Sequence, residues 1–123
     1  MNEKAQQLLD RTFGFGVNTL KFLRKLPDNY IERVAKGQLA RSSTSIGANY
    51  EEAQGAVSKK DFTHKIGICF KEARESVYWL RILKELFPEE PYKKDFSTLI
   101  SEGIELKKIF STIKKLSTTN PNR

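Results

Sequence analysis

Histidine and cysteine are almost absent from the chain, which argues against the common metal centres and disulfide frameworks. The 123 residues contain one cysteine, Cys69, and one histidine, His64. A structural zinc site takes about four Cys or His ligands, and a di-iron helical bundle takes a Glu-x-x-His pair from each of two helices. Cys69 lies among apolar neighbours and is expected to be a buried small hydrophobic residue. We therefore predict neither a metal nor a cofactor.

Proline, glycine and long apolar runs are also scarce. The chain has four prolines and seven glycines, and no apolar run approaches the roughly 18 residues that a membrane span needs. The first ten residues are too polar for a secretory signal. No strand-like alternation, P-loop or dinucleotide-binding glycine pattern is found, and no motif marks an activated serine. We expect a helical, cytoplasmic protein that is not an enzyme.

Helix-breaking residues divide the chain at positions 26–29, 56–58 and 87–91. Between them the apolar residues recur at helical spacing, which predicts helices over residues 3–25, 29–55, 58–86 and 92–117. Ser58 is the expected N-cap of the third helix, and residues 118–123 are expected to fray. Short connections favour antiparallel neighbours, so the predicted fold is all-α: one up-down four-helix bundle domain over residues 1–117.

The same spacing predicts which side chains face the core. The expected inward residues are Leu8, Leu9, Phe13, Val17, Leu20 and Leu23 on the first helix; Ile31, Val34, Leu39, Ile46 and Ala53 on the second; Phe62, Ile66, Cys69, Ala73, Val77, Leu80 and Phe87 on the third; and Phe96, Leu99, Ile100, Leu106, Ile109, Ile113 and Leu116 on the fourth.

The third predicted helix carries a second apolar stripe about 120° from the first. Glu72 and Glu75 lie among its members, which are Ile68, Trp79, Ile82 and Leu86. A helix in a lone bundle needs one apolar stripe, so the second predicts a surface covered by a neighbouring subunit. The alternative is that both stripes merge into one wide core of a single chain.

Small residues dominate positions 42–48 of the second predicted helix, with the sequence Ser, Ser, Thr, Ser, Ile, Gly, Ala. Ser, Thr and Gly cost roughly 0.5 to 1 kcal/mol each in a helix relative to Ala, so the run indicates close approach of a neighbouring backbone. Polar residues at three- or four-residue spacing lie along one side of this helix. With Glu72 and Glu75 they predict a partly buried polar seam, or alternatively a solvated face; these residues are Arg41, Ser45, Asn49 and Glu52.

Positive charge is in excess, with 22 Lys and Arg against 15 Asp and Glu and a formal net charge of +7. Residues 37–57 contain one basic and two acidic residues, so the excess lies on the flanking helices. Such a distribution suits an acidic partner such as nucleic acid, although a generic solvated surface is the alternative. The candidate phosphate contacts outside the apolar stripes are Lys71, Arg74, Arg81, Lys107, Lys108, Lys114 and Lys115.

Two motifs stand out on the second and third predicted helices. The first is Gln38-Leu39-x-Arg41-Ser42-x-x-Ser45-Ile46-x-x-Asn49-x-x-Glu52. The second is Asp61-Phe62 followed by Lys71-Glu72-Ala73-Arg74-Glu75-Ser76-x-Tyr78-Trp79-Leu80. Together they resemble the bacterial 23S rRNA intervening-sequence proteins, a family of four-helix bundle proteins in which many members have Gly at the position of Ala53.

The resemblance implies an assembly as well as a fold. Relatives form ring-shaped homopentamers, and a similar protein, the accessory variability determinant of diversity-generating retroelements, is a basic pentamer that binds nucleic acid and its reverse transcriptase. Two functions are therefore expected as alternatives. One is a basic oligomer that binds structured RNA or RNA/DNA hybrids, and the other is a scaffold for a partner protein. Neither involves a membrane.

Overall fold

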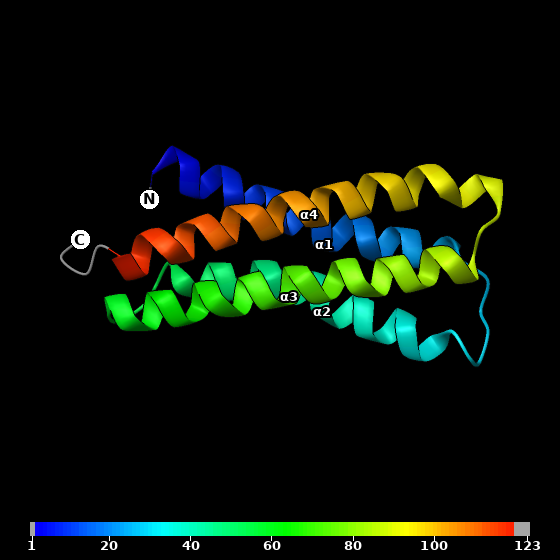
Figure 1. The fold of residues 1–123 in the computed structure, drawn as a ribbon, viewed down its shortest axis with the longest axis horizontal. Coiled ribbons are helices and arrows are strands. Elements are labelled where there is room, and N and C mark those ends of the chain that lie inside the picture. The colour runs from blue at the N-terminus through cyan, green and yellow to red at the C-terminus, as the bar shows by residue number, and fades with distance from the viewer. Residues whose placement is uncertain (1, 120–123) are drawn as a thin grey trace.

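The protein folds into four helices, described over residues 2–119 by a computed structural model. The helices are α1 (Glu3–Lys25), α2 (Arg33–Ala53), α3 (Lys59–Leu86) and α4 (Glu90–Thr119). α1 packs against α2 and α4, and α3 packs against the same two helices. The start of α1 and the end of α4 lie at the same end of the molecule (Figure 1). The architecture is thus an all-α up-down bundle, as predicted.

Local hydrogen bonds explain where the first three helices begin. Asn2 caps α1 by accepting from the backbone N–H of Ala5 at 2.7 Å, and Ser58 caps α3 by accepting from that of Asp61 at 3.0 Å. The second helix begins at residue 33 rather than 29. The Asn29 side chain accepts from the backbone N–H of Ile31 at 3.0 Å, and its backbone carbonyl oxygen accepts from that of Arg33 at 3.1 Å, so a hydrogen-bonded turn leads into α2.

Three helix ends also differ from the sequence expectation. α2 ends at Ala53, two residues before the expected end at 55. α4 begins at Glu90 rather than at 92, since Pro91 is tolerated in the first turn, where its missing N–H has no helical partner. α4 continues to Thr119, so residues 118 and 119, which were expected to fray, are helical. The remainder of the expected frayed tail, residues 120–123, lies outside the described residues.

The core face of α1 differs from the predicted one. Phe13 and Leu20 are 73% and 40% exposed. The buried stripe consists of Leu8, Thr12, Phe15, Thr19, Phe22 and Leu26. Its two threonines are polar, so a prediction based on the spacing of apolar residues does not include them. Thr12 satisfies its hydroxyl by bonding to the carbonyl oxygen of Leu9 at 3.1 Å. α1 therefore exposes Phe13 and Leu20, which the sequence prediction placed in the core.

Three further residues predicted to face inward are exposed. Ile31 and Val34 are 71% and 68% exposed because α2 starts late and buries Ala35 instead. Leu116 is 62% exposed near the end of α4. Besides Phe15 and Phe22 of α1, the core gains two aromatic residues that were not predicted, Tyr50 and Phe110, whose ring centroids lie 5.5 Å apart.

Close approach of α1 and α2 explains part of the small-residue run. A Cβ at Gly47 would lie 3.3 Å from the Thr12 hydroxyl oxygen, and one at Gly16 would lie 3.4 Å from the Ser43 carbonyl oxygen. The distance at Gly47 is tighter than ordinary van der Waals contact, and the distance at Gly16 is at the lower limit of such contact. A side chain at Gly47 would therefore require α1 to shift, and one at Gly16 would fill all the space between the helices. Ser42 and Ser43 are buried. The predicted need for small residues is confirmed here, and the neighbour is a helix of the same chain.

Candidate nucleic-acid interface and polar seam

An ion-pair cluster joins α2 to α3. Arg41 Nη1 lies 2.7 Å from Glu72 Oε2, and Nη2 of the same guanidinium pairs with Glu75. Trp79 donates its indole N–H to Glu75 at 3.2 Å. The Glu72 side chain is 7% exposed, whereas that of Arg41 is 50% exposed. The charge of the buried Glu72 carboxylate is therefore compensated by the half-exposed guanidinium of Arg41.

The contacts of the cluster shift the pKa values of Arg41 and Glu75. Burial acts to raise the pKa of Glu75, but hydrogen bonds from Arg41 and Trp79, together with the charges of Arg41 and Lys71, bring it below its ordinary value. Hydrogen bonding to Glu75 raises the pKa of Arg41. Each group favours the charged form of the other, so the pair stays ionised around neutral pH.

Three residues predicted for the seam lie apart from this cluster. Asn49 donates to the carbonyl and hydroxyl oxygens of Ser45 on its own helix, both at 2.9 Å. Glu52 is 60% exposed and pairs with Lys65 at 2.9 Å. The structure thus brings Arg41, Glu72 and Glu75 together. It leaves Ser45 and Asn49 to contacts within α2 and gives Glu52 a separate α2–α3 ion pair.

A second α2–α3 contact is absent from the sequence prediction. The hydroxyl oxygens of Ser42 and Ser76 lie 2.9 Å apart, and both residues are buried. Ser42 lies seven residues after Ala35, and Ser76 lies seven residues after Cys69, and both of these neighbours are buried. This spacing could have indicated that the two serines occupy core positions. Buried serines are easily assigned to a surface because most serines in proteins are exposed.

The second apolar stripe of α3 is largely covered within one chain. Ile68, Trp79 and Ile82 are half-buried, and Leu86 is 44% exposed. Trp79 and Ile82 pack against the core. This favours the alternative in which the two stripes merge, so the stripe by itself does not require a neighbouring subunit.

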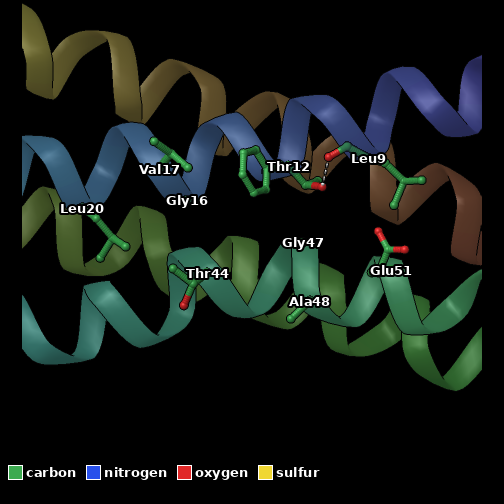
Figure 2. A pocket seen from close by; sticks show the side chains of 10 residues that line it. Leu9, Thr12, Gly16, Val17, Leu20, Thr44, Gly47, Ala48 and Glu51 are labelled. Atoms are coloured by element: carbon green, nitrogen blue, oxygen red, sulfur yellow. Dashed lines mark hydrogen bonds between the residues drawn. The ribbon is translucent and has the colours of Figure 1, made fainter.

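The largest exposed apolar side chains of α1 line a groove against α2. The groove has a volume of about 420 Å³, and its walls include Phe13, Val17, Leu20 and Ala48. Figure 2 shows Leu20 toward one end and Glu51 toward the other. A second cavity of about 650 Å³ shares Val17 and Leu20 and extends past the basic residues Lys21 and Arg24. The groove and the second cavity together form a mainly apolar surface along α1 and α2, with Glu51 in the groove and Lys21 and Arg24 in the second cavity.

Exposed cations lie on the face of α3 opposite the core. Lys71, Arg74 and Arg81 are exposed, and in the described part of the chain none has a carboxylate within ion-pair distance. Lys60, His64 and Tyr78 are not among the sequence-predicted contacts, although their three- and four-residue spacing places them on the same face. We call this face the basic stripe. Its members are Lys60, His64, Lys71, Arg74, Tyr78 and Arg81. It spans 21 residue steps, or about 32 Å of helix.

A lysine of α4 extends the basic stripe at Gly67. The Lys114 ammonium nitrogen lies 3.5 Å from the position that a Cβ of Gly67 would occupy. Gly67 lies three residues after His64 and four before Lys71, so it is on the same face of α3 as the basic stripe. The missing side chain leaves room for Lys114 to place its charge there.

The four predicted lysines of α4 fall into two pairs. Lys107 and Lys114 are seven residues apart and share one face, whereas Lys108 and Lys115 lie about 100° farther round the helix. Lys108 has a carboxylate oxygen of Glu105 at 3.9 Å. The structure therefore associates Lys114, and by its spacing Lys107, with α3, and separates the other pair from the basic stripe.

The chain's one cysteine is an inert core residue. Cys69 is fully buried and its thiol lies 3.5 Å from the Ile46 carbonyl oxygen. Burial raises its pKa to about 12, which keeps the thiol protonated and unreactive. Over the described residues no three His, Cys, Asp or Glu side chains gather as metal ligands do. No described helix is both long and apolar enough to cross a membrane.

These features define a basic four-helix bundle with a polar seam between α2 and α3. The chain belongs to the 23S rRNA-intervening sequence protein family, whose profile matches residues 4–112. It is also similar to a solved structure from Bacteroides thetaiotaomicron, described as a protein with unknown function from the S23 ribosomal protein family. The two are 33% identical with a TM-score of 0.77, over 87% of this chain and 97% of that one. A comparison with curated proteins gave no match.

Proposed function

We propose that the chain is a non-enzymatic nucleic-acid-binding protein that contacts phosphates through the basic stripe. The observation that carries the proposal is a line of exposed cations on the side of α3 opposite the core. Lys71, Arg74 and Arg81 have no ion-pair partner among the described residues. Unpaired surface cations are free to replace the counterions of a phosphate backbone, which is the main source of non-specific affinity.

The spacing of the basic stripe suits a backbone rather than a single phosphate. Its members recur about once per helical turn of about 5.4 Å, so they present charge along an extended line. Such contacts fix position without reading sequence. The family is named for the intervening sequences of 23S rRNA, which agrees with a structured RNA or an RNA/DNA hybrid as partner.

We further propose that copies of the chain associate through the α1–α2 groove. Phe13 is 73% exposed there, and burying large apolar side chains is the main driving force for association. Glu51 in the groove and Lys21 and Arg24 in the second cavity give a second copy charges to match. The family resemblance favours a homopentameric ring, which would repeat the basic stripe once per subunit and add weak contacts through multivalency.

Fluorescence anisotropy with a labelled structured RNA tests the nucleic-acid proposal. The triple variant Lys71→Gln, Arg74→Gln, Lys114→Gln should bind more weakly than wild type at low salt. The matched control Lys108→Gln, Lys115→Gln changes two exposed lysines away from the basic stripe and should lose less affinity. If wild-type protein binds neither RNA nor an RNA/DNA hybrid at low salt, the proposal fails, and a scaffold for a partner protein becomes the better explanation.

A further inference from the structure

We infer that Tyr78 stacks on an unpaired base, so that the basic stripe prefers single-stranded segments of its nucleic acid. The inference rests on the proposed function and adds the class of ligand. Tyr78 is 54% exposed on α3. It lies four residues after Arg74 and three before Arg81, so a strand that follows both arginines passes over its ring.

The Tyr78 ring is supported from one side. Its centroid lies 5.1 Å from that of Trp79, with the two ring planes at 75°. The indole of Trp79 is held in turn by its hydrogen bond to Glu75, which pairs with Arg41. The polar seam therefore fixes the neighbour against which Tyr78 rests. A ring with few accessible orientations loses little entropy when a base stacks on it.

The chemistry of the surface distinguishes single strands from duplexes. In a duplex the bases are stacked on one another, so an aromatic side chain on a helix surface meets only backbone. In a single strand the bases can splay outward and stack on Tyr, while Lys and Arg follow the phosphates. A purely electrostatic face needs no aromatic residue between its two arginines. Tyr78 thus adds a contact that only unpaired nucleotides can make.

Two substitutions at position 78 isolate the ring. Tyr78→Leu keeps an apolar side chain without the aromatic face, and Tyr78→Phe keeps the face without the hydroxyl. The probes are a labelled twelve-nucleotide oligouridylate and a labelled twelve-base-pair RNA duplex, compared by anisotropy at low salt. Because the side chain is more than half exposed, both variants should fold, and thermal melting checks this.

Tyr78→Leu should weaken binding of the single strand by about fivefold or more, the loss expected for one stacked base. Binding of the duplex should stay within about twofold of wild type, and Tyr78→Phe should resemble wild type on both probes. Equal single-strand affinity for Tyr78→Leu and wild type overturns the inference, while the stripe variants still lose affinity and the proposed function stands. Loss on both probes to the same extent also overturns it. If wild type binds neither probe, the inference and the proposed function both fail.

Discussion

Replacing Arg41 with Met should destabilise the bundle markedly. Methionine keeps much of the apolar stem and removes the charge that pairs with Glu72 and Glu75. Breaking a fully buried pair costs about 3 to 5 kcal/mol, because a charge is left without compensation. An exposed pair contributes about 0 to 1 kcal/mol. Glu72 is 7% exposed and Arg41 50%, so we expect about 2 kcal/mol.

Urea denaturation followed by far-UV circular dichroism measures this loss. For a domain of this size, about 2 kcal/mol corresponds to a fall of about 8 °C in melting temperature. Glu52→Gln is the matched control, since it breaks a more exposed pair with Lys65 and should change stability by less than about 1 kcal/mol. Adding Glu72→Leu to Arg41→Met should restore part of the stability, because the stranded carboxylate is then gone. Equal effects of Arg41→Met and Glu52→Gln would refute this account of the seam.

Phe13→Glu should reduce self-association measured by light scattering after size exclusion, without lowering the melting temperature of the subunit, because Phe13 is 73% exposed in the chain. An unchanged molecular mass of the assembly for Phe13→Glu would place the interface elsewhere. Trp79→Glu is a poorer probe of assembly because Trp79 packs against the core. Stability should fall on acidification below the ordinary Glu75 pKa of 4.5, because that pKa is lowered in the folded chain and the stability it contributes is lost as pH falls through the lowered value. Glu75→Gln should show a shallower pH dependence of the urea midpoint than wild type, and equal slopes would contradict the sign of this shift.

Helix number and order follow from the sequence because turn residues and apolar spacing agree with each other over long segments. The face that each helix buries is harder to predict when a helix has two candidate stripes. α1 buries the stripe with Thr12 and Thr19 and exposes the one with Phe13. The buried stripe packs against neighbours whose position depends on the whole bundle, so a spacing rule applied to one helix cannot choose between the two.

In the candidate site, too, spacing within one helix predicts some contacts, whereas others depend on how two helices pack together. Arg41, Glu72 and Glu75 are identified as neighbours by helical spacing once α2 and α3 are assumed to pack together. Glu52 has the same spacing, but its partner Lys65 is set by the level at which the antiparallel helices meet. Lys114 reaches the basic stripe only because Gly67 lies at the facing position of α3. Such a coincidence between two helices cannot be predicted from either one alone.

The salt dependence of nucleic-acid binding tests the central claim most directly. If about five phosphates are neutralised, log K against log salt should fall with a slope of about −4 to −5 on a duplex and about −3.5 on a single strand. The variant Lys71→Gln, Arg74→Gln, Lys114→Gln should make both slopes shallower by about 2 to 3, whereas Lys108→Gln, Lys115→Gln should change them less. Unchanged slopes in the stripe variant would contradict the claim and place the phosphate contacts on another face.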